Sequence, residues 1–247
     1  MSLDLSPTGS AAPRTQQVLA HARTEALLIA RNGEQALLAL VIPIAILLGG
    51  RFFGDRLDLP FASTAPSVLA LAIWSSCFTS LAIATGFERR YNVLERLSAT
   101  PLGKTGILLG KALGIAAITT GQVVVLAGVA LLLGWRPDPD PAHLLVALLC
   151  AVLGMAASAG LALSLAGTAR PEVTLAVANL VYLVGMAAGI MLPVARYPSW
   201  LQPLIQALPT GALGEGLRSG TPLSILVLAV WCIAGLALSR KVFSWTS

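Results

Sequence analysis

Ionisable side chains are sparse in this 247-residue chain, and six of them gather in residues 87–104. The segment reads FERRYNVLERLSATPLGK, and apolar sequence flanks it on both sides. The chain presents no catalytic constellation, so the chemistry that this segment suits is polar contact with a soluble surface. Its ionisable residues are Glu88, Arg89, Arg90, Glu95, Arg96 and Lys104.

The order of residues inside the segment predicts a short amphipathic helix over 93–100. Asn92 takes a turn or left-handed conformation at low cost. Val93, Leu94 and Leu97 then fall at i, i+1 and i+4, which gives one apolar stripe beside charged neighbours. Pro101 cannot continue a helix. The alternative interpretation of the pattern is a solvated loop between two membrane spans.

This segment resembles the cytoplasmic loop of the ABC-2 type permeases, the membrane subunits of ATP-driven exporters. The shared order is acidic–Arg, a turn residue, Leu-Glu-x-Leu and Thr-Pro-Leu. Where the family usually has Gly-Thr, this chain has Asn92 and Val93, and Asn tolerates a positive φ. The resemblance implies a coupling helix that docks on a separate ATPase subunit. The implied interface residues are Glu88, Arg89, Arg90, Leu94, Glu95, Arg96, Leu97, Thr100 and Pro101.

Composition indicates an all-α integral membrane protein. The chain is 56% hydrophobic and 11% charged, with a mean hydropathy of +0.83, whereas soluble domains carry about 25% charged residues. Six apolar segments approach the length that crosses about 30 Å of hydrocarbon. They are residues 36–53, 66–86, 106–133, 141–166, 173–193 and 222–239. Pro66 is expected in a first helical turn, and Asp140 is expected to cap the helix that starts at Pro141.

The chain ends are expected outside these spans. Residues 1–13 are predicted to be a disordered tail, and 240–247 a cytoplasmic tail. Residues 14–35 combine an apolar helical period with scattered charges, which predicts an amphipathic helix in the membrane interface. A soluble helix of a cytoplasmic tail is the alternative. The 36–239 region would then form the permease domain.

The distribution of basic residues predicts the topology. With both termini in the cytoplasm, eleven of the sixteen Lys and Arg residues lie inside and five outside. This places the 87–105 loop in the cytoplasm, where an ATPase subunit would be. Frequent Ala, Leu and Arg with few Lys suggest a high-GC bacterial source and therefore a plasma-membrane location. The net charge of +5 suits this topology rather than nucleic-acid binding.

Residues 194–221, before the last span, predict a re-entrant or interfacial helical hairpin. Apolar positions recur at a helical period from Trp200 to Leu208, and a second short segment covers 212–218. A plain interfacial loop is the alternative. ABC-2 permeases have two short outer helices here, with Pro between them and Arg closing the second, and the hairpin helps to close the pathway. The implied outer-gate residues are Trp200, Leu204, Pro209, Glu215 and Arg218.

The spans hold little ionisable chemistry. Lys111 is expected to snorkel to the surface. No Asp or Glu lies mid-span, which counts against transport driven by ions. The Gly110/Gly114 and Gly185/Gly189 spacings suit close helix contacts or dimer packing. Uncharged polar residues either line a pathway or form hydrogen bonds between helices; they include Ser76, Thr79, Thr119, Gln122, Asn179 and Tyr182.

No cofactor or metal is expected on this chain. Gly106 to Lys111 reads G-x-x-x-G-K, but a phosphate-binding P-loop needs one more spacer and a following Ser or Thr. Cys77, Cys150 and Cys232 lie in apolar runs, and the two histidines lie on separate segments. ATP and Mg would therefore bind the partner ATPase subunit.

The resemblance implies a function and its partners. The chain would be the permease subunit of an ATP-driven exporter that moves an apolar or amphipathic substrate outward. Its partners would be ABC ATPase subunits, a second identical or similar permease, and the lipid bilayer, with no nucleic acid. Two alternatives stay open: an ATP-independent carrier or channel, and a membrane anchor or assembly factor that transports nothing.

Overall fold

The computed structural model describes residues 12–57 and 59–245, and this part of the chain is all helical, without a strand. Most of the predicted 1–13 tail lies outside the described residues. The elements in chain order are α1 (Arg14–Arg31), α2 (Gly33–Phe53), η1 (Gly54–Leu57), α3 (Phe61–Trp74), η2 (Ser75–Ser80), α4 (Leu81–Arg90), α5 (Val93–Ser98), α6 (Gly103–Leu132), α7 (Pro141–Thr168), α8 (Pro171–Gly185), η3 (Met186–Ile190), η4 (Val194–Arg196), α9 (Gln202–Ala207), α10 (Pro209–Ser219) and α11 (Leu223–Val242).

Within the described residues, five helices are long and apolar enough to cross a membrane. The chain is therefore a multi-pass membrane protein. A shorter apolar helix, Ala39–Phe53, occupies most of the first predicted span, so a count of six spans stays a prediction. The five long helices are Phe61–Arg90, Gly103–Leu132, Pro141–Thr168, Pro171–Ile190 and Leu223–Val242.

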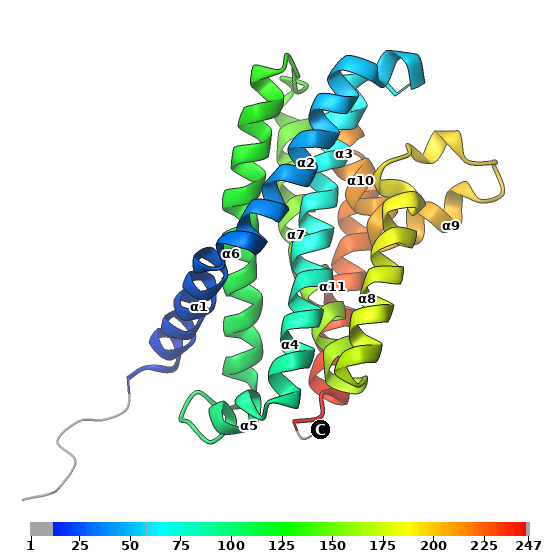
Figure 1. The fold of residues 1–247 in the computed structure, drawn as a ribbon. Coiled ribbons are helices and arrows are strands. Elements are labelled where there is room, and N and C mark those ends of the chain that lie inside the picture. Colours follow the sequence, from blue (N-terminus) through cyan, green and yellow to red (C-terminus); the bar gives the residue numbers. More distant parts are fainter. Residues whose placement is uncertain (1–11, 58, 246–247) are drawn as a thin grey trace, which may run out of the picture.

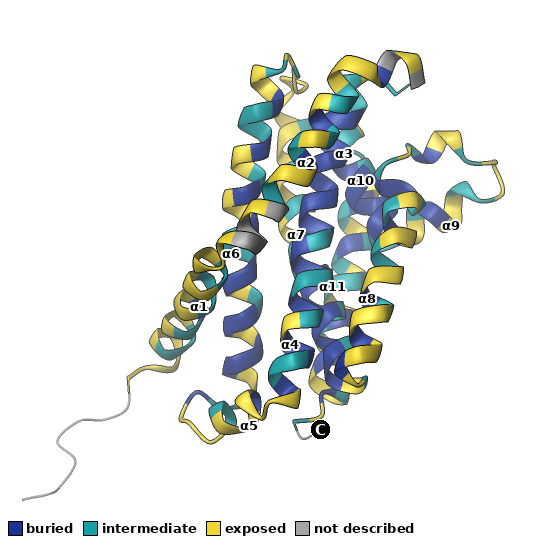
Figure 2. Cartoon of the chain, viewed as in Figure 1, coloured by how far each residue is buried: buried dark blue, intermediate teal, exposed yellow. Residues whose placement is uncertain are grey.

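The centre of the bundle is a continuous rod made of α3, η2 and α4 (Figures 1 and 2). In its most apolar window 72% of the residues are buried, far more than in the other spans. The prediction that Pro66 opens this helix is wrong, because α3 begins at Phe61, directly after Pro60. The carbonyl of Pro60 accepts from the backbone N–H groups of Ser63 and Thr64, which starts the helix before the apolar run.

Helix α7 packs on α11 along most of its length, with its backbone close to that of its neighbour. A Cβ on Gly160 would lie 2.8 Å from the carbonyl carbon of Gly235, so the contact requires glycine at 160, and a Cβ on Gly235 would be a tight 3.1 Å from the nitrogen of Leu161. The Asp140 cap is confirmed: its Oδ1 accepts from the N–H of Ala142 at 3.1 Å. This cap satisfies one of the free donors at the start of a helix.

Helix α6 is about 45 Å long at 1.5 Å per residue, more than the hydrocarbon core needs. Its first half is covered by α1, which lies against it at an incline (Figure 1). Helix α1 packs against a row of three glycines on α6, which are Gly106, Gly110 and Gly114. An added Cβ on Gly110 or Gly114 would come closer than 3.0 Å to atoms of α1. The close contact expected of Gly110 and Gly114 is thus a contact with α1.

The bundle has two distinct ends (Figure 1). One end, called here the α5 end, carries α5, the start of α1 and the C-terminus. The opposite end, called the hairpin end, carries η1, the 133–140 loop and the α9–α10 hairpin. The fifth span was predicted to reach Pro193, but its helix ends at Ile190, where Ala188 and Gly189 leave helical geometry.

Candidate functional site

Helix α5 is held to the bundle by one side of its surface. Asn92 precedes it in the left-handed conformation, with φ 56°, as the sequence predicts. Leu94 is fully buried and Leu97 packs partly against the core, which confirms two positions of the predicted apolar stripe, but Val93 is 40% exposed, so its place in the stripe is wrong. Glu95 and Arg96 are exposed, and neither forms an ion pair with any described residue. The helix therefore presents a charged outer face on a fixed apolar base.

The chain leaves α5 through a tight turn. The helix ends at Ser98, two residues before the predicted limit at residue 100, and the hydroxyl of Thr100 donates to the carbonyl of Leu97 at 2.6 Å. Pro101 follows, and Gly103 takes φ +65° at the start of α6. Because Pro101 cannot donate a backbone hydrogen bond, the helix cannot run on into α6.

The two basic residues before α5 both contact neighbouring spans. Arg89 is 5% exposed, and its guanidinium donates to the carbonyls of Ala166 and Ala169 at 2.8 and 2.9 Å. These carbonyls belong to the end of α7, where the last acceptors of a helix lack partners and favour a cation. Arg90 forms an exposed ion pair with Glu172 of α8. Both arginines therefore tie the base of α5 to neighbouring spans.

A buried charge cluster joins α1, α4 and α6 next to this base. The Lys111 side chain is 1% exposed, and its Nζ lies 2.8 Å from Glu25 and 2.5 Å from Glu88. The prediction that Lys111 snorkels to the surface is wrong, because two carboxylates hold its ammonium inside. His21 lies 3.5 Å from Glu25, one helical turn away on α1. Burial lowers the pKa of His21 below its ordinary value of 6.5.

Sequence reasoning missed this cluster, although two signals for it are present. His21 and Glu25 are four residues apart, which places them on one face of α1. Gly106, Gly110 and Gly114 are also four residues apart and leave room for a helix. Read together, these two patterns pair the polar face of α1 with the glycine face of α6, which holds Lys111.

The hairpin end has a different construction. Two short helices lie where the hairpin is predicted: α9 begins at Gln202 and ends at Ala207, and α10 begins at Pro209. The second helix therefore starts three residues before the predicted limit at residue 212. A re-entrant or interfacial position in the membrane stays a prediction. Trp200 and Leu204 are exposed, at 77% and 59%. Gly211 lies so close to α9 that a Cβ there would be 1.9 Å from the carbonyl oxygen of Ile205.

Polar side chains of the hairpin complete the broken end of α8. The side chain of Arg218 is 5% exposed, and it donates to the carbonyls of Gly189 and Ile190 and to the hydroxyl of Ser67. Glu215 pairs with Arg218 at 3.0 Å and accepts from the N–H of Val194 at 2.9 Å. Unpaired backbone groups are costly at membrane depth, so these contacts explain how α8 can unwind.

Two further hydroxyls serve the same broken segment. Thr210 donates to the carbonyl of Ala188 at 2.8 Å, and Tyr197 donates to the carbonyl of Ala187. Tyr197 also accepts from the N–H of Gly189 at 3.2 Å. The irregular segment and the hairpin are therefore one hydrogen-bonded unit.

A comparison with protein families identifies the family of this chain. The model of the ABC-2 type transporter family matches residues 16–221. This chain belongs to the ABC-2 type transporter family. The match covers most of the chain, from α1 through both regions just described to the end of the hairpin. A search of the curated proteins finds no match.

Membership fixes the broad role of the chain. The ABC-2 membrane domain is a transmembrane permease component of an ABC transporter, and this family generally works with separate ABC ATPase subunits. The G-x-x-x-G-K run lies inside helix α6 of the permease. Among the described residues, no group of three or more His, Cys, Asp and Glu side chains could hold a metal ion.

The predicted pathway residues of this ABC-2 permease divide into two groups. The Ser76 hydroxyl donates to the side-chain oxygen of Gln122 at 2.8 Å, and Gln122 donates to the carbonyl of Ala39 at 2.7 Å. Thr119 accepts from the thiol of Cys77 at 3.4 Å. These contacts join α2, η2 and α6, which is the alternative role of hydrogen bonding between helices.

The other three residues make fewer contacts. Thr79 has a buried hydroxyl oxygen without a partner in the described structure. Asn179 lies on the exposed face of α8 and donates only to the carbonyl of Leu175 in its own helix, and Tyr182 on the same helix is half-buried. A pathway role stays a prediction for all six residues.

Proposed function

We propose that this chain is the permease subunit of an ATP-driven exporter and that α5 is its docking element for the ATPase subunit. The observation that carries the proposal is the asymmetry of α5. Its apolar side is anchored by Leu94, while Glu95 and Arg96 are exposed without partners in the described chain. An exposed charge pair on a rigid base suits complementary polar contact with another protein.

The contacts behind α5 supply a route by which a push on this helix reaches the spans. Leu94 links α5 to the core, Arg89 links α4 to the end of α7, and Lys111 links α4 to α1 and α6. A displacement of α5 would therefore move four helices together rather than bend one loop. Closure of two ATPase subunits around ATP and Mg would provide that displacement.

The remaining parts of the proposal rest on charge and on family membership. The Lys and Arg distribution supports cytoplasmic termini and a cytoplasmic α5 end in a plasma membrane. A second identical or similar permease would complete the pathway. The cargo would be apolar or amphipathic and would leave the cell. The α9–α10 hairpin would then close the outer end of the pathway.

Transport in inverted membrane vesicles tests this proposal. With the permease and its ATPase subunit present, uptake of an apolar fluorescent cargo should require hydrolysable ATP and should stop when the ATPase loses its catalytic residues. A proton uncoupler should leave uptake unchanged. If the uncoupler abolishes uptake while loss of ATPase activity does not, the chain is a carrier independent of ATP. If no condition gives uptake, an anchor or assembly role replaces the proposal.

A further inference from the structure

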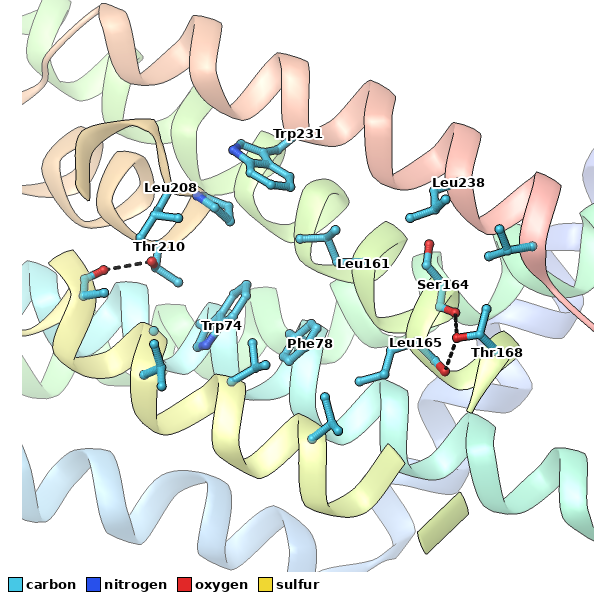
Figure 3. Close-up of a pocket in the computed structure, with 17 residues that line it drawn as sticks. Trp74, Phe78, Leu161, Ser164, Leu165, Thr168, Leu208, Thr210, Trp231 and Leu238 are labelled. Atoms are coloured by element: carbon cyan, nitrogen blue, oxygen red, sulfur yellow. Dashed lines mark hydrogen bonds between the residues drawn. The ribbon is translucent and has the colours of Figure 1, made fainter. Parts of the chain in front are cut away.

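Two cavities of this permease differ in the charge of their walls. One, of about 480 Å³, lies between η2, α7, α8 and α11, and no ionisable side chain lines it (Figure 3). The other, of about 660 Å³, is a groove between α1 and α6, called here the α1–α6 groove, and two arginines line it. Ligand sites typically have volumes of about 300–1,000 Å³. Both cavities have that size, but only the groove carries charges that indicate a class of ligand.

The outer end of the α1–α6 groove is polar and positively charged. Arg14 and Thr15 come from the first turn of α1, Thr105 from the first turn of α6, and Arg240 from the last turn of α11. The two helix starts are adjacent, because an added Cβ on Gly103 would lie 3.9 Å from Nη2 of Arg14. Neither first turn holds an acidic residue, so no side-chain carboxylate from these turns offsets the positive charge.

Both arginines of the groove are exposed and free to bind. Among the described residues, the guanidinium of neither Arg14 nor Arg240 makes a hydrogen bond or an ion pair. Arg89 and Arg218, in contrast, donate to backbone carbonyls of neighbouring segments. The planar guanidinium fits a phosphate group with two parallel hydrogen bonds. The polar end therefore has the donors and the charge that a phosphate requires.

The wall of the groove beyond this polar end is apolar. Val18 and Leu19 follow one turn further along α1, and Leu109 and Leu113 follow one and two turns further along α6. Leu113 lies about 12 Å beyond Thr105, at 1.5 Å per residue. Because α6 is long and apolar enough to span the membrane, the wall runs from the end of a span into it (Figure 1). A charged end followed by an apolar wall matches the order of a phospholipid, headgroup first and acyl chain after.

We propose that the α1–α6 groove binds an anionic phospholipid of the leaflet at the α5 end. Its phosphate contacts Arg14 and Arg240, and one acyl chain lies along Leu109 and Leu113. Basic pockets between membrane helices recognise anionic headgroups, whereas a zwitterionic headgroup would bring its own cation to a groove without an acidic side chain. Lipid binding needs neither the ATPase nor transport, so this proposal and the exporter function can each fail alone.

Competition between two lipids tests the charge of the headgroup. The purified full-length chain in mild detergent is mixed with equal amounts of phosphatidylglycerol and phosphatidylcholine that carry the same acyl chains. Native mass spectrometry then counts the lipids retained on each chain. One phosphatidylglycerol should be retained with a preference of about tenfold or more, since each arginine near an anionic lipid is worth about fivefold in affinity. Equal retention of the two lipids would overturn the proposal.

A matched pair of double variants tests the position. Arg14→Gln with Arg240→Gln should abolish the preference for phosphatidylglycerol. The control is Arg23→Gln with Lys241→Gln, two exposed residues outside the groove. Arg23 follows Arg14 by nine residues, or two and a half turns, which places it on the opposite face of α1. Both variants lose two positive charges, and the control should keep the preference. An equal loss in both would mean general attraction to a basic surface and would overturn the proposal.

The acyl chain is tested with ligands that share the phosphate. Long-chain phosphatidylglycerol should bind more tightly than a short-chain form, because the short chains cover less of the apolar wall. Glycerol phosphate has no chain and should not displace the long-chain lipid, even in large excess. Full displacement by glycerol phosphate would assign the groove to a free phosphate group instead of a lipid. Unfolding of all four proteins in this comparison, the wild type, the two double variants and Arg14→Gln alone, should be the same, since the altered residues are exposed.

Discussion

The α5 end and the hairpin end both hold short helices with charged residues, yet they treat those charges in opposite ways. At the hairpin end, the buried Arg218 donates to carbonyls of η3, and the largely buried Glu215 pairs with Arg218 and accepts from the N–H of Val194. On the outer face of α5, Glu95 and Arg96 are exposed and make no ion pair with a described residue. The difference separates charges that hold the fold from charges available to another molecule.

The same contrast exists within the α5 end. Lys111 and Arg89, at the base of α5, are as buried as Arg218 and are held by carboxylates or by helix-end carbonyls. The α5 region therefore has a buried base and a charged outer face without partners among the described residues. Substitutions at the base should affect the stability of the fold, and substitutions on the outer face should affect binding to the ATPase.

The largest effect on stability is expected at the hairpin end. Arg218→Met should lower the free energy of unfolding by about 3–5 kcal/mol, because it leaves Glu215 buried without its partner. Unfolding of the detergent-solubilised protein by added denaturing detergent measures this change. Arg136→Met, at an exposed position, is the control and should change the value by less than about 0.5 kcal/mol. Similar values for both variants would end the contrast between the two ends.

Lys111→Met should have the next largest effect, about 3 kcal/mol, because two carboxylates lose their shared cation. Adding Glu88→Gln should recover part of the loss, since one uncompensated charge is removed. The same unfolding measurement applies. Purely additive losses in the double variant would show that the two side chains act independently.

Asn92→Val should lower the free energy of unfolding by about 1–2 kcal/mol, because the left-handed conformation is strained for a residue with a branched Cβ. Gly accepts this conformation freely, so Asn92→Gly should stay close to the wild type. Unfolding of these two variants, side by side, isolates the backbone requirement of the turn into α5. Equal stability of both would mean that α5 does not depend on this turn.

His21 should make a smaller, pH-dependent contribution. Because burial lowers the pKa of His21 in the fold, the unfolded chain binds more protons between that lowered pKa and about 6.5, and stability rises with pH across this window. Unfolding between pH 5 and pH 8 should show this rise, and His21→Gln should reduce it. Glu25 and Lys111 face the imidazole; an unchanged slope in the variant would assign the rise to another group.

Local features of the site could be predicted from the sequence, and long-range ones could not. The positive φ of Asn92 and the inward position of Leu94 and Leu97 depend on neighbouring residues, and both are confirmed, whereas Val93 of the same predicted stripe is exposed. Arg89 donates to Ala166, 77 residues away along the chain, and Lys111 binds Glu25, 86 residues away. Which helix faces which decides such contacts, and one amphipathic pattern does not contain that information.

The same limit applies to the spans. Hydropathy located the long apolar helices because each must be apolar along its whole length. The break at Ala188 and Gly189 depends on hydrogen bonds from Thr210 and Arg218, which are about twenty to thirty residues further along the chain.

Co-purification with the ATPase subunit tests the central claim most directly. The test variant exchanges the two charges on the outer face of α5 and carries Glu95→Arg together with Arg96→Glu. The control exchanges Arg136→Asp with Asp138→Arg in the exposed loop at the hairpin end. Both exchanges keep the net charge, and neither alters a residue buried in the fold.

If α5 docks on the ATPase, an ABC ATPase should co-purify in mild detergent with the wild type and with the control at equal yield. The α5 variant should lose about tenfold or more, because like charges would face each other in the interface, while its unfolding stays unchanged. Retention of the ATPase by the α5 variant at the wild-type level would contradict the account, as would its absence from the wild type.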